Sequence, residues 1–200
     1  MGPPVRLITA TRNDHKLREL EQILVGFELV ALPAEVDLPP EDGETFEANA
    51  LEKARATHSA CGEAALADDS GIVAIALGGR PGVRSARFAG EGASDEENLD
   101  LLISELSASE DRSVAYVCAL AHIDAGGTET VVVARCEGTL ILEPRGDRGF
   151  GYDPAFVPYD TGPDDARTMA ELTDAEKHAI SHRGRAAREL ARVLGSGGKP

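Results

Sequence analysis

The spacing of apolar residues along the chain predicts strands that alternate with helices. Apolar and β-rich runs predict extended chain at residues 6–10, 30–38, 64–67, 72–77, 114–123 and 130–136. Apolar residues at helical spacing predict helices within residues 17–24, 46–61 and 96–106, and two more helices after residue 159. Gly26 and Gly62 close the first two helices, and the turn Ala125-Gly126-Gly127 joins the last two extended segments as an antiparallel hairpin. This mixture indicates an α/β protein with a mixed sheet.

Length, composition and charge are those of a globular protein. The chain has 200 residues, 42% hydrophobic and 28% charged, so we expect one domain at 1–195, divided into two lobes, and a disordered tail at 196–200. No stretch approaches the ~20 apolar residues of a membrane span, and no secretory segment opens the sequence, which predicts a cytoplasmic protein without a membrane partner. The scattered cysteines 61, 118 and 136 are expected to be reduced thiols. The net charge of −15 argues against a nucleic-acid partner.

The motif Thr11-x-Asn13-x-x-Lys16 lies between the first predicted strand and the first predicted helix. A helix N-terminus offers unpaired N–H groups and a partial positive charge, so it suits a phosphate, and hydroxyl, amide and ammonium groups add donors. A simpler interpretation makes Asn13 the helix N-cap and leaves Lys16 in solvent. The segment lacks the glycines of a Walker A loop.

Acidic residues gather at Glu41-Asp42-Gly43-Glu44 and at Asp68-Asp69-Ser70-Gly71. Carboxylates that emerge from an apolar strand are costly unless they bind a cation or reach solvent. Because side chains alternate along a strand, Asp68 and Asp69 should face opposite ways, and only one of them should lie in a site. The competing interpretation is an Asp-Ser-Gly turn held by Asx hydrogen bonds.

Aromatic residues concentrate in the glycine-rich segment Gly149-Phe150-Gly151-Tyr152-Asp153, although the chain has only five phenylalanines, three tyrosines and no tryptophan. Such a loop suits a flat slot for a stacked base, with Asp153 as a hydrogen-bonding edge. A plain hydrophobic loop anchor is the alternative.

Lys177, His182 and Arg183 lie close together near the ends of the two C-terminal helices. The nearby Thr173-x-x-Glu176 is a capping box, so those two residues have a structural explanation. His182 suits base stacking, and Arg183 suits a bidentate contact with a base or a phosphate. The alternative for this cluster is a solvated surface.

Taken together and in this order, these segments resemble the inosine/xanthosine triphosphate pyrophosphatase family, and the likeness runs from Leu7 to Leu194. Each segment alone is weak evidence, whereas the ordered set is specific. The matching segments are Thr11-x-Asn13-x-x-Lys16, Thr45-Phe46 with Asn49-Ala50 and Lys53-Ala54, Asp68-Asp69-Ser70-Gly71, Gly78-Gly79-x-Pro81-Gly82, Ser85-Ala86-Arg87, Gly149-Phe150-Gly151-Tyr152-Asp153-Pro154, and Glu176-Lys177 with Ser181-His182-Arg183-Gly184.

The resemblance implies an α/β fold of the ITPase type, an elongated mixed sheet flanked by helices with two lobes around a central nucleotide cleft. It implies hydrolysis of non-standard purine nucleoside triphosphates (dITP, ITP and XTP) to the monophosphate and pyrophosphate, with Mg²⁺ as cofactor and a homodimer as the assembly. Asp69 would be the general base and a metal ligand, and Glu41 the second ligand. The residues implied to bind substrate are Thr11, Arg12, Asn13, Asp14, His15, Lys16, Lys53, Ser70, Phe150, Gly151, Tyr152, Asp153, Lys177, His182 and Arg183.

Selectivity for the base would come from donors placed opposite the 6-oxo group, because adenine presents an amine there. Arg183 and backbone N–H groups near Phe150 are the expected donors.

Two alternative functions stay open. The first is a related pyrophosphatase that acts on modified pyrimidine nucleotides; its early motif resembles Ser-x-x-Arg, where this chain has Asn13-x-x-Lys16. The second is a non-catalytic nucleotide-binding module, which would have no use for the Asp69 carboxylate.

Overall fold

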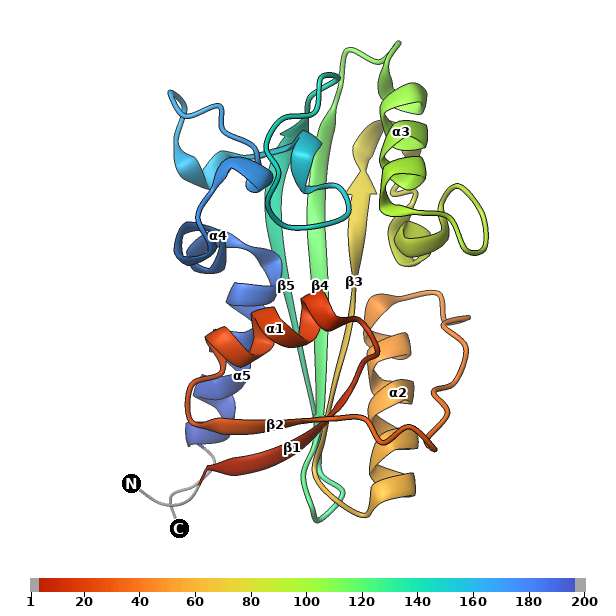
Figure 1. Cartoon of the computed structure of the whole chain (residues 1–200), viewed down its shortest axis with the longest axis vertical. Helices are drawn as coiled ribbons and strands as arrows, with labels where there is room; N and C mark the ends of the chain where they lie inside the picture. Colours follow the sequence, from red (N-terminus) through yellow and green to blue (C-terminus); the bar gives the residue numbers. More distant parts are fainter. Residues whose placement is uncertain (1–3, 197–200) are drawn as a thin grey trace. The chain divides into compact units, whose positions relative to one another are not determined.

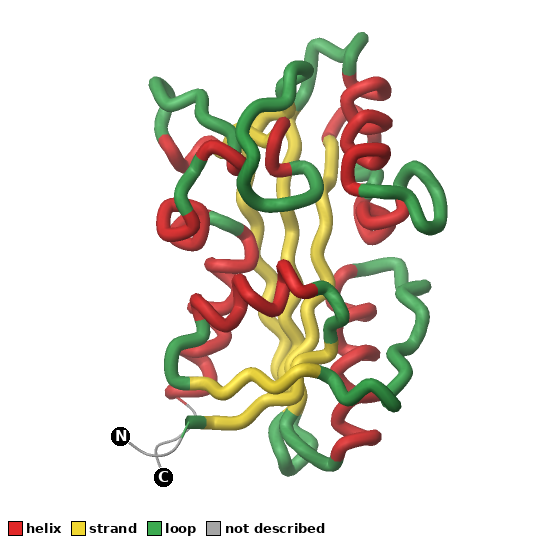
Figure 2. The backbone as a smooth tube through the Cα atoms, viewed as in Figure 1, coloured by secondary structure: helices red, strands yellow, loops and turns green. Residues whose placement is uncertain are grey.

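The computed structural model describes residues 4–196, in which strands and helices alternate along most of the chain (Figure 1, Figure 2). The helices are α1 (Asp14–Ile23), α2 (Phe46–Cys61), α3 (Asp95–Leu106), α4 (Asp174–Ile180) and α5 (His182–Ser196). The strands are β1 (Val5–Ala10), β2 (Phe27–Ala31), β3 (Ala65–Ala74), β4 (Ser113–Ile123), β5 (Glu129–Leu140) and β6 (Phe156–Pro158).

Six strands of the described chain form a mixed sheet in the order β2-β1-β3-β4-β5-β6. β1 pairs in parallel with β2, where Val5 faces Phe27, and with β3, where Ile8 faces Ala65. β5 pairs antiparallel with β6. The predicted α/β class with a mixed sheet and flanking helices is therefore confirmed.

The chain divides into two compact units. The first consists of the described residues up to Asp69, Cys118–Ala134 and the chain from Arg183 onward, and the second of Ser70–Val117 and Arg135–His182. As a result β3, β4 and β5 each contribute residues to both units. Of the expected tail, Ser196 ends α5 and residues 197–200 lie outside the described residues.

The first unit has a core formed by α1, α5 and the strands beneath them. Leu20 of α1 and Leu190 of α5 are fully buried, because apolar residues recur along each helix at intervals that place them on one face. They pack in one cluster with Leu7, Leu66 and Leu120 of the sheet. No helix within residues 4–196 is long and apolar enough to cross a membrane.

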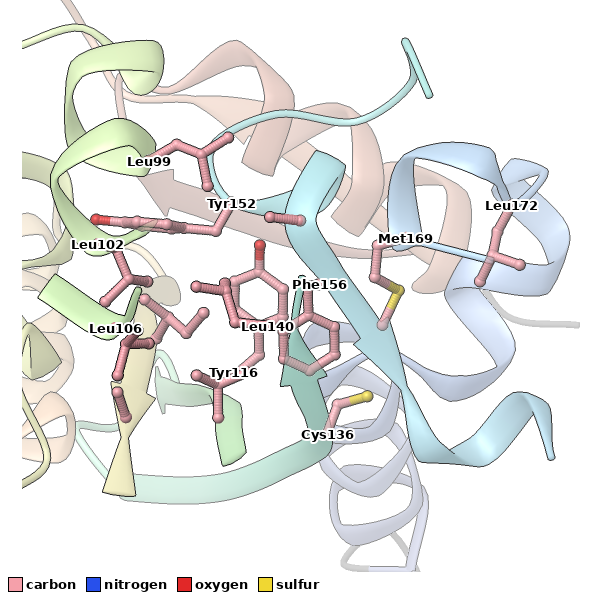
Figure 3. Close-up of a cluster of buried hydrophobic side chains, with 14 residues drawn as sticks. Leu99, Leu102, Leu106, Tyr116, Cys136, Leu140, Tyr152, Phe156, Met169 and Leu172 are labelled. Carbon is pink, nitrogen blue, oxygen red and sulfur yellow. The ribbon is translucent and has the colours of Figure 1, made fainter. Parts of the chain in front are cut away.

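The second unit has a core rich in aromatic side chains (Figure 3). Tyr116 of β4 and Phe156 of β6 pack with their ring centroids 4.5 Å apart. Leu102 of α3, Tyr152 and Leu140 belong to the same buried cluster. Because Tyr152 and Phe156 belong to this core, it anchors the segment that contains Phe150 and Asp153.

Most of the predicted elements are present. Gly62 ends α2 in the left-handed conformation at φ 66°, and the hairpin of β4 and β5 forms across Ala125-Gly126-Gly127. The capping box at the start of α4 is also present. All three cysteines are free thiols, with Cys118 and Cys136 buried.

Two predictions of extended chain were wrong, and so was one alternative. The second strand spans Phe27–Ala31 instead of 30–38, because its pairing with β1 ends at Ala31 and Pro33 has no N–H to continue a ladder. Residues 75–77, expected to be extended, form a 3₁₀ turn that ends at Gly78. The alternative of a turn at residues 68–71 is wrong as well, since β3 runs without a break from Ala65 to Ala74.

Candidate active site

Two adjacent carboxylates on β3 face opposite sides of the strand. Asp68 contacts Lys16 and Arg183, whereas Asp69 contacts Asn49 and Lys53. Both aspartates are buried, with 1% and 3% of their surfaces exposed. The alternation expected from strand geometry is therefore confirmed, and it divides the charges of the first unit into two sets.

The Asp69 set contains a carboxylate, an amide and an ammonium group. Asn49 Nδ2 donates to Asp69 Oδ2 at 3.0 Å, and Lys53 Nζ lies 3.5 Å from Asp69 Oδ1. Lys53 also donates to the backbone oxygen of Asp68 at 2.7 Å and to the Glu41 carboxylate. Burial raises the pKa of Asp69; the Lys53 charge opposes this rise and the Glu41 charge adds to it. A carboxylate with a raised pKa can accept a proton at a pH nearer to neutrality.

Helix α2 and the loop before it position this set. Asn49 and Lys53 lie one turn apart on the buried face of α2 and therefore reach the same strand. Asn49 Oδ1 accepts a hydrogen bond from Gly43 N at 2.8 Å. A side chain at Gly43 would begin 2.5 Å from that oxygen, so glycine lets the loop that carries Glu41 lie directly against the helix.

The Asp68 set is a buried network of charges. Lys16 Nζ lies 2.6 Å from Asp68 Oδ1, and Arg183 Nε donates to Asp68 Oδ2 at 2.9 Å. Arg183 Nη1 bonds to Glu19 Oε2 at 2.5 Å, and the Cys118 thiol lies 3.2 Å from Asp68 Oδ2. Burial would raise the pKa of Asp68, but the charges of Arg183 and Lys16 outweigh burial and hold it well below its ordinary value. Asp68 is therefore ionised and holds Lys16 in place.

The start of α1 has the predicted cap. Asn13 Oδ1 accepts from the backbone N of His15 at 3.0 Å and of Lys16 at 3.2 Å, and Thr11 Oγ1 accepts from Asn13 N at 3.1 Å. Asn13 thus occupies two of the N–H groups that the sequence offers to a phosphate. The alternative that placed Lys16 in solvent is wrong, since its side chain is only 16% exposed and bonds to Asp68.

Other residues near this cap point elsewhere. Asp14 and His15 are exposed in the first turn of α1. Arg12 Nη2 donates to the backbone oxygens of Val36, at 2.7 Å, and Ala34, at 3.3 Å, so it holds the loop after β2. The cation that α1 brings to the carboxylates of β3 is Lys16.

The second unit holds another buried polar set, centred on Asp153. Asp153 Oδ2 accepts from Lys177 Nζ at 2.7 Å and from Phe150 N at 3.0 Å, and Asp153 Oδ1 accepts from Tyr116 Oη at 3.0 Å. The Lys177 ammonium also lies 5.2 Å from the centre of the half-buried Phe150 ring. The loop therefore presents an aromatic face and a cation together.

The same loop is fixed at two further points. Gly151 N donates to Asp95 Oδ2 at 2.8 Å, and Tyr152 Oη donates to the backbone oxygen of Ser85 at 2.7 Å. Burial, followed by the charge of Asp95, raises the pKa of Tyr152, which keeps its hydroxyl protonated as a donor. The hydrophobic-anchor interpretation therefore applies to Tyr152, while Phe150 is only partly covered.

The C-terminal cluster is not a solvated surface. Lys177, His182 and Arg183 are each at most 6% exposed. His182 stacks on Tyr116 with ring centroids 4.6 Å apart and an interplanar angle of 11°. Although His182 and Arg183 are adjacent in sequence, they belong to different units, and the Arg183 guanidinium donates to Asp68 and Glu19.

A model of the Ham1 family matches residues 7–193 of the chain. The chain belongs to this family. It is 48% identical to the dITP/XTP pyrophosphatase of Mycobacterium tuberculosis over 98% of each chain. It is 47% identical to the dITP/XTP pyrophosphatase of Geobacter sulfurreducens, over 95% of this chain and 96% of that one. The structure of a HAM1 protein from Coxiella burnetii superposes with a TM-score of 0.84 at 38% identity, over 96% of this chain and 99% of the other.

Within this Ham1 family chain, the structure brings Lys16, Lys53, Glu41 and the two aspartates together in the first unit, and Phe150, Asp153, Lys177 and His182 together in the second. Ser70 follows Asp69 on β3 and is half-buried. The catalytic, substrate and metal roles of these residues stay predictions. Sequence reasoning missed the contacts of Asn49 with Asp69 and of Tyr116 with Asp153. The first had a signal, because Asn49 precedes Lys53 by one helical turn.

Proposed function

We propose that the chain hydrolyses non-standard purine nucleoside triphosphates, dITP, ITP and XTP, to the nucleoside monophosphate and pyrophosphate. The observation that carries the proposal is the Asp69 set: a buried carboxylate of raised pKa, held by Asn49 and adjoining the Lys53 ammonium. The relatives named as dITP/XTP pyrophosphatases, which share nearly half of their residues with this chain, support the choice of substrate.

The proposed reaction is attack of water on the α-phosphorus, with pyrophosphate as the leaving group. Asp69 takes the proton of the water, since it is the buried carboxylate with the raised pKa. The attack adds charge to an already anionic centre, so fixed cations stabilise the transition state. Lys53 and Lys16 supply them: Lys53 adjoins Asp69, and the charge of Lys16, which is bonded to Asp68, also acts on Asp69 and opposes the rise in its pKa. The carboxylate and backbone partners of the two lysines hold the ammonium groups in place before substrate arrives.

Asp69 and Glu41 also fit a Mg²⁺ site. Both carboxylates reach the same Lys53 ammonium, so their oxygens converge on a position where positive charge is stabilised. Two carboxylates are enough for such a site, because proteins commonly hold Mg²⁺ by one or two carboxylates together with substrate phosphates. When bound, Mg²⁺ would neutralise phosphate charge and lower the pKa of the attacking water.

Recognition of the base is assigned to the second unit. Phe150 offers a face for stacking, and the Lys177 ammonium, which Asp153 holds, lies 5.2 Å from the centre of that ring. Phe150 N and Gly151 N already donate to Asp153 and Asp95, so Lys177 is the better candidate for the donor to the 6-oxo group. Adenine would place an amine against that ammonium and be rejected. A base contact by Arg183 would have to compete with the Asp68 and Glu19 carboxylates.

The deciding experiment is pyrophosphate release measured over a panel of triphosphates with and without Mg²⁺. We expect turnover of ITP, dITP and XTP well above that of ATP and GTP, and a loss of turnover in Asp69→Asn. Preference for a modified pyrimidine triphosphate would favour the related pyrophosphatase type instead. Binding without pyrophosphate release would favour a non-catalytic module. We also propose, from the family resemblance, that the protein is a homodimer and is located in the cytoplasm. Light scattering at several protein concentrations tests the proposed homodimer.

A further inference from the structure

Tyr116 connects two side chains that the proposed function assigns to the base. It lies on β4, and its surface is 6% exposed. Its hydroxyl donates to Asp153 Oδ1 at 3.0 Å, and its ring lies parallel to the His182 ring, with centroids 4.6 Å apart. Phe156 packs against the same ring, with centroids 4.5 Å apart (Figure 3).

The hydroxyl determines how the Asp153 carboxylate is turned. Oδ2 accepts from Lys177 Nζ and from Phe150 N, and Tyr116 is the donor that the described residues offer to Oδ1. A carboxylate with three donors has one favourable orientation, because rotation about its Cβ–Cγ bond would break all three bonds at once. Tyr116 therefore keeps Oδ2 directed at Lys177.

We propose that Tyr116 is a positioning residue for base recognition, which orients Lys177 through the Asp153 carboxylate and His182 through the stacked ring. This inference rests on the proposed function. It deepens that function by naming the single side chain on which the polar and the aromatic parts of base recognition both depend. Tyr116 itself does not touch the substrate in this account.

The hydroxyl and the ring can be separated by substitution. Tyr116→Phe keeps the ring and its stack on His182 but leaves Asp153 Oδ1 buried without its donor. Hydrogen bonds to charged groups are strong, so we expect KM for ITP to rise about tenfold, with kcat changed less than about threefold. The ratio of kcat/KM for ITP over ATP should fall by a similar factor, because Lys177 is no longer held against the 6-oxo group.

Inhibition by inorganic tripolyphosphate separates a role in base recognition from a general structural role, because a structural defect would change its inhibition constant. Tripolyphosphate has no base, so its inhibition constant should be the same in Y116F and wild type. Tyr159→Phe is the matched control: it removes the same hydroxyl from a side chain that is 56% exposed, and we expect unchanged KM for ITP. Thermal melting of each variant accompanies the kinetics.

Each result decides the inference. A rise in KM for ITP together with an unchanged tripolyphosphate constant supports it. Unchanged KM and unchanged base discrimination in Y116F overturn it, and so does a parallel loss of tripolyphosphate binding or a large drop in Tm, which would make the hydroxyl a general structural group. A wild-type protein that releases no pyrophosphate from ITP would overturn the proposed function itself, and the inference with it.

Discussion

Replacing Arg183 by methionine should destabilise the protein more than removing the charge of an exposed side chain does. The Arg183 side chain is 1% exposed, and it is bound to Asp68, whose side chain is fully buried, and to Glu19, whose side chain is 13% exposed. Methionine fills most of the volume but removes the charge. Asp68 would then remain in the interior, still bonded to Lys16.

The magnitude follows from what is left behind. Breaking a buried pair by removing one partner costs about 3–5 kcal/mol, because the other charge stays buried and uncompensated. Lys16 still offsets part of the Asp68 charge, so we expect about 3 kcal/mol. For a chain of this size that corresponds to a fall in Tm of roughly 6–12 °C.

Urea unfolding followed by far-UV circular dichroism, at one fixed protein concentration, measures this loss. Arg192→Met on the same helix is the control: its ion pair with Glu189 is exposed, and we expect a change below about 0.5 kcal/mol. Adding Asp68→Asn to Arg183→Met should recover part of the stability, since the uncompensated charge is gone. A loss in Arg183→Met no larger than in Arg192→Met would refute the reasoning.

Three further results are expected. Gly149→Ala would place a Cβ 2.0 Å from Asp153 Oδ2, so KM for ITP should rise more than tenfold by the same reasoning on charged hydrogen bonds. Gly127→Ala, at a glycine that also has positive φ but nothing within 4 Å of the added Cβ, should change KM little in the same assay. Burial lowers the pKa of His122 from 6.5, so below pH 6.5 the unfolded chain binds a proton more readily than the folded chain, and the free energy of unfolding should fall as the pH drops. In urea titrations, His122→Leu should lose less stability than wild type between about pH 7.5 and about pH 5.5. Glu41→Gln should require roughly tenfold more Mg²⁺ for half-maximal pyrophosphate release, and an unchanged Mg²⁺ requirement would remove that carboxylate from the metal site.

Local patterns predicted most of the elements and part of the site. The opposite orientation of Asp68 and Asp69 followed from the alternation of side chains along a strand, which neighbouring residues alone determine. The cap at Asn13 and the capping box at Thr173 followed from short-range chemistry for the same reason.

Contacts between distant segments could not be predicted in this way. Arg183 follows His182, and the sequence grouped them, but successive residues on a helix point about 100° apart and meet different neighbours. Tyr116 and Asp153 are separated by 37 residues, and nothing near either position indicates the other. Such pairs depend on how elements pack, which the pattern of a single segment does not contain.

Asp68 and Asp69 are chemically the same side chain on consecutive residues, so their different partners are a consequence of strand register alone. A shift of β3 by one residue against β1 would exchange the two faces. The Asp69 carboxylate would then meet Lys16 and Arg183, and Ser70 would take its place beside Asn49 and Lys53. The composition of the chain would be unaltered, yet the position beside Asn49 and Lys53 would hold a hydroxyl instead of a carboxylate. The pairing Ile8–Ala65, far from any reacting atom, is thus part of what makes Asp69 the proposed base.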